Sequence, residues 1–307
     1  MIIDVHYHFV RLPTDEGMAR NMLEGLLVGA ERLGMKKPLD EVMPLYRDYM
    51  DDSECDKLVK RMDASGINVT VINVVDNINF GLDNERIMRI NRYCSKAAAK
   101  HPGRIIALAG IDPRRPDAPA LFRQCIEEFS MKGLKWHPDD GYYPNSEESY
   151  AVLEVANEFG LPLLTHCSPL PTSRAKYAHP IHLDDITIDF PNIDIIAAHM
   201  GYMWWRDWAA LAQFKKNIYG DLAMWDLMAE SRPDIFRRYL REILDIVGTD
   251  QVLFASDGPI HEPHVSKQRW VEIIKGLSTD SADGIKFSDE EVEAILGGNA
   301  ARIFKLE

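Results

Sequence analysis

The chain has 307 residues and a formal net charge of −13, with 48 acidic residues against 35 Lys and Arg. That length fits either one parallel α/β barrel, which typically needs about 250 residues, or two smaller domains. The negative charge argues against nucleic acid as a partner, and no apolar run approaches the roughly 20 residues of a membrane span. The four cysteines form no C-x-x-C pair, which favours a reducing, cytoplasmic location over a disulfide framework.

Short apolar runs alternate with longer segments of helical periodicity along the whole chain, which is the pattern of βα units around a parallel sheet. We predict eight strands, at Ile2–Val5, Asn68–Val75, Arg104–Ile111, Gly133–Trp136, Leu161–Thr165, Ile193–Ala198, Asn217–Leu222 and Gln251–Ser256. We predict helices at Glu54–Ser65, Asn84–Lys100, Pro116–Ser130, Ser146–Phe159, Ile181–Phe190, Trp205–Lys216, Pro233–Val247 and Asp289–Phe304. Eight units favour a single (β/α)8 TIM barrel over residues 1–307.

One connection is too long for a βα loop, which usually has about 2 to 6 residues. Residues 10–53 separate the first strand from its helix, and Asp15–Leu33 has helical spacing. An insertion after a barrel strand lies over the face where active sites form, so we interpret this segment as a cap on the substrate pocket. The alternative is an insertion that only packs against a neighbouring subunit.

Polar side chains stand where several predicted strands end. His6 and His8 are two residues apart on the first strand and therefore share one face. Three further residues end later apolar runs, namely His166, His199 and Asp257. Strand ends meet at the active-site face of a barrel, and imidazoles with a carboxylate suit a divalent transition metal, by default Zn²⁺, with Mn²⁺ or Fe²⁺ as alternatives.

These motifs resemble the amidohydrolase superfamily. The similarity runs through D-V-H-Y-H, A-K-H-P-G-R-I-I-A-L-A-G-I-D-P, G-L-K-W-H-P, L-T-H-C, A-H-M-G, N-I-Y-G-D-L and F-A-S-D-G-P. It is most similar to the branch of the aminocarboxymuconate-semialdehyde decarboxylase-like proteins and the short amidohydrolase 2 hydrolases. The resemblance implies a mononuclear metal site, and it implies a homodimer because paired barrels are common in that family.

The resemblance also assigns roles to the strand-end residues. It implies that the metal ligands are His6, His8, His166 and Asp257, and that His199 contacts the bound water or the substrate. Asp257 and His199 are then the catalytic residues, since both can handle a proton of that water. Lys135 lies where some members of the superfamily carry a carboxylated lysine, but its surroundings resemble the mononuclear branch, so we do not expect carboxylation.

Weaker signals predict the substrate-binding residues. Lys135 and His137 share one face of the fourth strand, and either can look into the site. Arg174 follows the fifth strand, and Trp204 and Arg206 follow His199, where they could bind a carboxylate or form a wall of the pocket. His261 and His264 follow Asp257, but we expect no metal role for them because the ligand positions are already filled.

Hydrolysis is the expected reaction: water activated on the metal attacks an ester, lactone or amide of a small, carboxylated substrate. The alternative is a metal-dependent, non-oxidative decarboxylase of an aromatic or unsaturated acid. The decarboxylases of the resembling branch usually carry Gly-Glu or Gly-Gly after the histidine that His199 matches, whereas this chain has G-Y-M-W-W-R. A minor alternative is a barrel that has lost activity, which the five intact strand-end groups oppose.

Overall fold

A computed structural model describes residues 1–76, 78–171, 173–280 and 284–306. The described chain contains one sheet of eight parallel strands in the order of the sequence. The strands are β1 (Ile3–His8), β2 (Val69–Asn73), β3 (Ile105–Gly110), β4 (Leu134–Trp136), β5 (Leu163–Thr165), β6 (Ile195–Ala197), β7 (Ile218–Asp221) and β8 (Val252–Leu253). Backbone hydrogen bonds from Val5 N–H to the Phe254 carbonyl and from His8 N–H to the Gly258 carbonyl join the last strand to the first. The predicted (β/α)8 barrel is confirmed.

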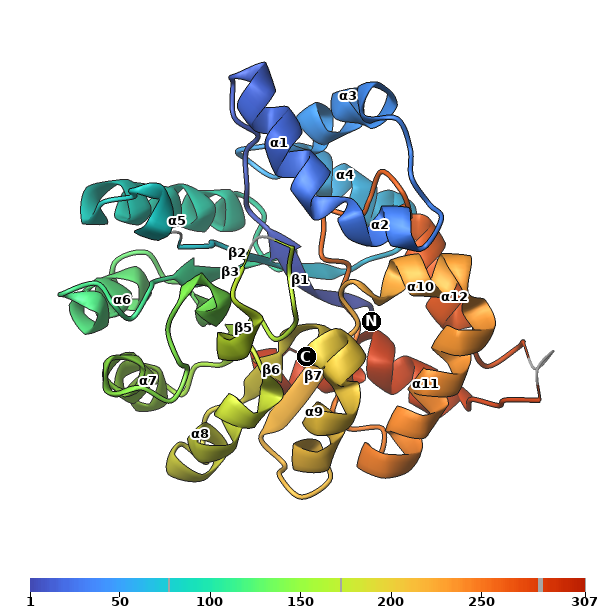
Figure 1. Ribbon diagram of the computed structural model, residues 1–307. Helices are drawn as coiled ribbons and strands as arrows, with labels where there is room; N and C mark the ends of the chain where they lie inside the picture. Colours follow the sequence, from blue (N-terminus) through green and yellow to red (C-terminus); the bar gives the residue numbers. More distant parts are fainter. Residues whose placement is uncertain (77, 172, 281–283, 307) are drawn as a thin grey trace.

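Helices surround this barrel on all sides (Figure 1). They are α1 (Glu16–Leu26), α2 (Val28–Arg32), α3 (Leu39–Met50), α4 (Asp56–Ser65), α5 (Asn84–Lys100), α6 (Ala118–Glu127), α7 (Glu147–Phe159), α8 (Asp184–Asp189), α9 (Trp205–Ala212), α10 (Trp225–Ser231), α11 (Pro233–Val247), α12 (Lys267–Gly276), α13 (Asp289–Glu293) and α14 (Asn299–Phe304). Local signals fix several ends: Asp83 caps α5, Ser146 caps α7, and Gly160 ends α7 in the left-handed conformation.

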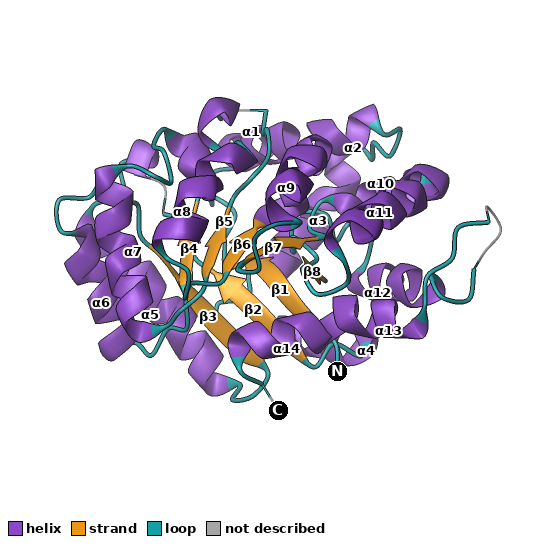
Figure 2. Ribbon diagram, turned by 90° about the horizontal axis from the view of Figure 1, so that it is seen from below, coloured by secondary structure: helices purple, strands orange, loops and turns teal. Residues whose placement is uncertain are grey.

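The barrel interior is a packed apolar core. Inward-facing residues such as Val5, Val71, Leu164 and Leu253 form one buried cluster together with Ile303 of α14. In Figure 2, α14 crosses the end of the barrel at which the termini lie, and the cap helices α1 and α2 lie at the other end. With one end filled by α14, the carboxyl ends of the strands are the face on which a site can form.

A β-bulge in β1 decides which of its side chains enter the barrel. The pairing with β2 shifts between Asp4 and Tyr7, so β1 has one residue more than its partner there. Val5 and His6 consequently both face the interior, while Tyr7 turns outward and its hydroxyl contacts Arg61 of α4. His6 and His8 still share one face, as the sequence predicted.

The 10–53 insertion forms α1, α2 and α3 and packs over the carboxyl face. Buried side chains of α1 and α3, including Leu23 and Tyr46, form a cluster with Ile260 in the loop after β8. The Tyr46 hydroxyl donates a hydrogen bond to the Ile260 carbonyl at 2.6 Å. A small cavity between residues 7–11 and residues 49–58 opens beside His8 under this cap.

Several predicted boundaries differ from the structure. Seven predicted strands are too long, whereas the first was predicted to end at Val5 and extends to His8. The segment predicted as one helix over Asp289–Phe304 is α13, a π-helical turn at Ala294–Gly298 and α14. Three helices, α3, α10 and α12, were not predicted. No helix in the described ranges is long and apolar enough to cross a lipid bilayer.

Candidate metal centre

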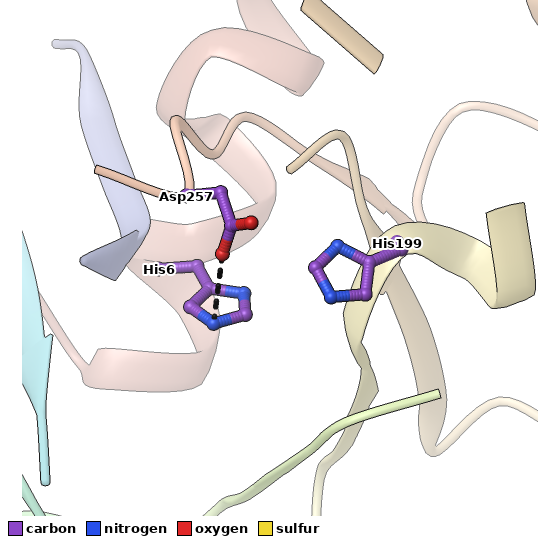
Figure 3. Close-up of side chains that lie close together, drawn as sticks. All are labelled: His6, His199 and Asp257. Carbon is purple, nitrogen blue, oxygen red and sulfur yellow. Dashed lines mark ion pairs between the residues drawn. The ribbon is translucent and has the colours of Figure 1, made fainter. Parts of the chain in front are cut away.

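The five predicted strand-end groups meet at one place on the carboxyl face. His6, His199 and Asp257 are buried, and one potential ligand atom from each lies within 4.8 Å of the others. Figure 3 shows the Asp257 carboxylate beside the His6 ring, with the His199 ring facing them from the other side. His8 Nε2 lies 3.1 Å from Asp257 Oδ1, and His166 Nδ1 lies 3.2 Å from His199 Nε2.

Two of these residues, His199 and Asp257, have a left-handed backbone conformation. Strand alternation places Ile196 and Ala198 in the barrel core and would point His199 outward. His199 instead has φ 65°, in the left-handed region, and the residues up to Tyr202 also have positive φ. Asp257 has φ 52°. Such conformations are unfavourable for non-glycine residues and cluster at functional sites.

Outer hydrogen bonds fix the tautomer of three histidines. His6 Nδ1 lies 3.0 Å from Asp221 Oδ2, and His199 Nδ1 lies 3.1 Å from the Ala223 carbonyl. His166 Nε2 lies 2.8 Å from the Ser168 carbonyl. Since carboxylates and carbonyls only accept, each of these nitrogens carries the proton. The other ring nitrogen of each histidine therefore presents a lone pair to the centre, as metal-binding histidines do.

This arrangement passes a test of fit for a divalent metal. Two ligand atoms about 2.0–2.1 Å from a tetrahedral Zn²⁺ lie roughly 3.3 Å apart. His8 and Asp257 at 3.1 Å, His166 and His199 at 3.2 Å, and His6 Nε2 and Asp257 at 3.5 Å are close to that separation. The lone pairs of His166 and His199 also face each other in a buried place, which a shared cation would stabilise. The residues present therefore fit a metal.

Electrostatics keep the histidines neutral and the carboxylate ionised. Burial lowers the pKa of His6, His166 and His199 below the ordinary value. Burial alone would raise the pKa of Asp257, but the hydrogen bond from His8 and the neighbouring histidines hold it well below its usual range. Neutral imidazole and ionised carboxylate are the forms that bind a metal.

Lys135 and His137 both reach the cluster from β4. Lys135 Nζ lies 2.9 Å from His6 Nε2, and burial lowers the pKa of this lysine to about 8. The His137 ring stacks on His166 with centroids 4.9 Å apart, and burial lowers its pKa to about 3. Among the described residues, His137 Nε2 is buried without a hydrogen-bond partner. A second group of potential ligands, His137, Asp139 and His166, therefore adjoins the first.

The other predicted substrate-binding residues lie farther out. Arg174 is exposed near Gly141, and its backbone N–H donates to the Asp139 carbonyl. Trp204 is half-buried against His179. Arg206 pairs with Glu242 of α11 at 2.8 Å and stacks on the Trp205 ring, so this structure gives it a role in joining α9 to α11.

Asp221 is the main residue of the centre to which the sequence analysis gave no role. It ends β7, binds His6 through one oxygen, and accepts the His199 backbone N–H through the other at 2.7 Å. The rule that found His166 and Asp257, a polar residue at a strand end, also applies to Asp221. Ser168 and Ala223 act through backbone carbonyls, which carry no sequence signal.

A family model described as amidohydrolase matches residues 3–306. The chain belongs to the amidohydrolase family. The resemblance in the motifs is thereby confirmed over nearly the whole length. A curated relative, the protein fluG of Emericella nidulans, is 30 % identical over 81 residues, a match that covers 26 % of this chain and only 9 % of fluG.

Several solved structures share the fold of this amidohydrolase at low identity. A TIM-barrel protein of Bordetella bronchiseptica has a TM-score of 0.70 and 16 % identity, with 99 % of this chain and 98 % of that chain covered. Dihydroxybenzoic acid decarboxylase of Polaromonas sp. JS666, solved with manganese and the inhibitor 2-nitroresorcinol, has a TM-score of 0.67 and 19 % identity over 99 % and 97 %. The 5-carboxyvanillate decarboxylase of Sphingomonas paucimobilis has a TM-score of 0.66 and 18 % identity over 100 % and 99 %.

Proposed function

We propose that this amidohydrolase is a metal-dependent, non-oxidative decarboxylase of a hydroxylated aromatic carboxylic acid. The observation that carries the proposal is the buried convergence of His6, His199 and Asp257, with His8 and His166 beside them, in a barrel that matches two such decarboxylases end to end. These similarities favour the decarboxylase alternative over the hydrolase that the sequence analysis put first. The hydrolase is not confirmed and becomes the competing outcome of the test.

We assign the metal to His6, His8, His166 and Asp257, with His199 beside it. Zn²⁺ is the default for such ligands, and the relative from Polaromonas holds Mn²⁺. A bound divalent ion supplies a Lewis acid that fixes and polarises the oxygen atoms of the substrate. Asp221, Ala223 and Ser168 hold the three imidazoles in the tautomers that this role requires.

The chain's own residues then account for the proton. The Asp257 carboxylate takes the proton of the substrate's ring hydroxyl and delivers it to the ring carbon that carries the carboxylate. The bond between that carbon and the carboxylate breaks, its electron pair restores the aromatic ring, and CO₂ leaves with no change of oxidation state. His199 faces the same space with the lone pair of Nε2, which can accept the hydrogen bond of the ring hydroxyl and orient it toward Asp257.

The test is a panel of 2,6-dihydroxybenzoate and 5-carboxyvanillate beside aryl esters and lactones, assayed with protein loaded with Zn²⁺ or Mn²⁺. We expect CO₂ from one of the acids and no turnover of the esters. Turnover of esters or lactones without CO₂ would establish the hydrolase instead. If the purified protein contains no metal and His166→Ala changes none of its properties, the result would indicate a barrel that has lost activity.

Asp257→Asn should separate binding from chemistry. It keeps the shape of the side chain but cannot carry the proton, so we expect kcat to fall by about 10²–10⁴-fold. The experiment compares initial rates of CO₂ release at equal metal content. An exposed aspartate in an ion pair, Asp245→Asn, is the matched control and should leave the rate unchanged. A rate in Asp257→Asn within a few-fold of the wild type contradicts the assigned role.

A further inference from the structure

A second group of potential metal ligands adjoins the metal centre described above and has no part in the proposed mechanism. His137, Asp139 and His166 each offer one ligand atom, and these three atoms lie within 4.8 Å of one another. His166 also belongs to the first centre, where its Nδ1 lies 3.2 Å from His199 Nε2. His137 and Asp139 are therefore the two residues of this second site that the first centre does not share.

The side chains of His137 and Asp139 are placed as two ligands of one ion would be. His137 Nδ1 lies 3.3 Å from Asp139 Oδ1, and the side chains are 13 % and 3 % exposed. Two ligand atoms of a tetrahedral Zn²⁺ are separated by roughly the same distance. In spite of the short distance, Asp139 Oδ1 accepts no hydrogen bond from any residue that the structure describes. The two atoms are thus close together without an aligned hydrogen bond between them.

Three buried polar atoms at this place lack a partner. Among the described residues, His137 Nε2, Asp139 Oδ1 and Ser173 Oγ have no hydrogen-bond partner. The Ser173 hydroxyl lies beside the Asp139 carboxylate. Buried polar groups nearly always have a partner, and an isolated buried carboxylate is costly. A cation at this place would supply the partner that the carboxylate lacks.

The backbone holds the two ligands in place. Both follow β4, where a 3₁₀ turn covers Pro138–Asp140. The backbone N–H of His137 donates to the Tyr142 hydroxyl at 3.1 Å. The backbone carbonyl of Asp139 accepts the N–H of Arg174 at 3.0 Å. The second site is therefore formed by a segment with fixed ends, so little conformational entropy would be lost when an ion binds.

We propose that His137 and Asp139 bind a second divalent metal ion beside the ion of the first centre. One imidazole and one carboxylate suit Mn²⁺ or Zn²⁺, and so small a ligand set leaves positions open for oxygen atoms of water or substrate. The first ion and the ammonium group of Lys135, 2.9 Å from His6, both repel a second cation, so we expect it to bind more weakly than the first. A second ion would depart from the mononuclear site that the resemblance to the family implies.

Mn²⁺ alone is the probe, added to metal-free protein and followed by titration calorimetry and by the EPR signal of the free ion. We expect the wild type to bind two equivalents, and Asp139→Asn and His137→Asn to bind one, with a thermal midpoint close to that of the wild type. His101→Gln is the matched control, because His101 Nε2 lies 3.1 Å from the carboxylate of the partly exposed Asp56. This variant should bind two equivalents.

The EPR spectrum of the bound ions shows where the second one lies. Two neighbouring Mn²⁺ ions should broaden each other's signal in the wild type, whereas the single ion of Asp139→Asn should give an uncoupled spectrum. One equivalent in the wild type, or two in either site variant, overturns the second site. Loss of both ions in a site variant, or two uncoupled ions in the wild type, overturns it as well.

Metal content and turnover test different proposals. Whether the second ion binds does not depend on the reaction that the protein catalyses. Release of CO₂ by protein that holds a single ion would overturn the second site and leave the proposed function standing. Two coupled ions without CO₂ from the acids of the panel would overturn the proposed function and leave the second site standing.

Discussion

Three imidazoles of the centre, those of His6, His166 and His199, each have one nitrogen hydrogen-bonded outward and one directed inward. Asp221 is the most connected of the outer groups, because it holds the ring of His6 and the backbone of His199 together. A buried carboxylate with these two partners fixes both the tautomer of His6 and the left-handed turn that brings His199 into the barrel. The geometry of the candidate metal centre therefore depends on a residue outside the set of proposed ligands.

Asp221→Asn tests this dependence. The amide keeps the volume but presents an N–H₂ group, so it no longer accepts equally well from His6 Nδ1. We expect metal affinity to fall by about 10- to 100-fold, measured by competition with a chelator of known affinity. Asp245→Asn serves again as the exposed control. Unchanged affinity in Asp221→Asn would show that the tautomer of His6 is fixed in another way.

A buried cation supports the neighbouring strand ends. Lys267 Nζ lies 2.6 Å from Asp4 Oδ2 and 2.7 Å from Ser256 Oγ, and the lysine and aspartate side chains are 1 % and 0 % exposed. Ser256 precedes Asp257, and its hydroxyl accepts the Gly258 backbone N–H. This network therefore anchors both neighbours of Asp257.

Lys267→Met removes the cation and leaves Asp4 charged in the interior. Breaking a buried ion pair from one side costs about 3–5 kcal/mol, and we expect that loss in the free energy of unfolding measured with urea. Lys57→Met is the control, because its pair with Asp48 is exposed and such a pair contributes at most about 1 kcal/mol. Similar losses in the two variants would contradict the structural role of Lys267.

Sequence reasoning predicted five strand-end residues for the centre, which the structure brings close together, but it could not give the direction of all of them. His166 and Asp257 continue the alternation of Leu164 and of Ala255, and His6 and His8 share one face, but this face turns inward only because of the bulge in β1. The direction of His199 could not be predicted in this way, because it depends on a left-handed backbone conformation that a histidine in the sequence does not indicate. Arg206 was predicted as substrate-binding from its position after His199, but the turn of α9 brings its guanidinium to Glu242 instead.

At the scale of elements, β7 packs closely against the segment that carries His199. Gly220 lies in β7, and a Cβ there would overlap the Met200 side chain and lie 2.8 Å from the Trp208 ring. Only glycine leaves room for Met200, the residue that follows His199. The side chains of Met200 and Trp208 thus pack directly on the backbone of β7.

In Gly220→Ala, the added methyl group should push β7 and that turn apart. Overpacking of a filled core costs about 1–3 kcal/mol, which we expect as a loss of unfolding free energy in denaturant titrations, together with reduced turnover. Gly276→Ala, at the end of α12 with no atom within 4 Å of the new Cβ, is the control and should be neutral or slightly stabilising. Full stability in Gly220→Ala would contradict the fit described for β7.

Helices were predicted accurately where the amphipathic pattern extended over many residues. The helices α5, α7 and α11 match their predicted ranges closely because their amphipathic patterns and end signals agree. The helix α3 contains Pro44, which argues against a helix when only the sequence is considered, whereas α12 has a local start signal in its N-cap Ser266 that the prediction did not use. All strands except the first were predicted too long because apolar residues continue beyond the last ladder hydrogen bond of each strand.

At the scale of the whole molecule, four histidines with a lowered pKa predict that acid destabilises the fold. The pKa of His6, His137, His166 and His199 lies below the ordinary value in the folded protein. The unfolded chain therefore binds more protons than the folded chain below a pH of about 6.5. Stability is full above this pH and falls as the pH decreases, by up to about 1.4 kcal/mol per pH unit for each histidine. Burial raises the pKa of Asp140 to about 7 and also raises the pKa of Asp76, Asp194 and Asp221, and these carboxyl groups oppose the trend.

Urea titrations of the metal-free protein at pH 7.5, 6.5 and 5.5 measure this effect. We expect the free energy of unfolding to decrease through this series. Replacing His137 by Asn removes one of the four groups and should make the decrease shallower. A free energy that stays constant or rises toward pH 5.5 contradicts the burial of neutral histidines.

The bulge in β1 also limits which one-residue deletions and insertions this strand can accept. Because of the extra residue, Val5 and His6 both face inward. The alternation of inward and outward side chains therefore shifts by one residue between the apolar core of the barrel and the candidate metal centre. Deleting Val5 would remove the extra residue and restore regular alternation, so that Ile3, His6 and His8 would still face inward but the core would lose one apolar side chain. A one-codon insertion between His6 and His8 would instead turn one of the two histidines outward, so this strand accepts single substitutions more readily than a longer chain.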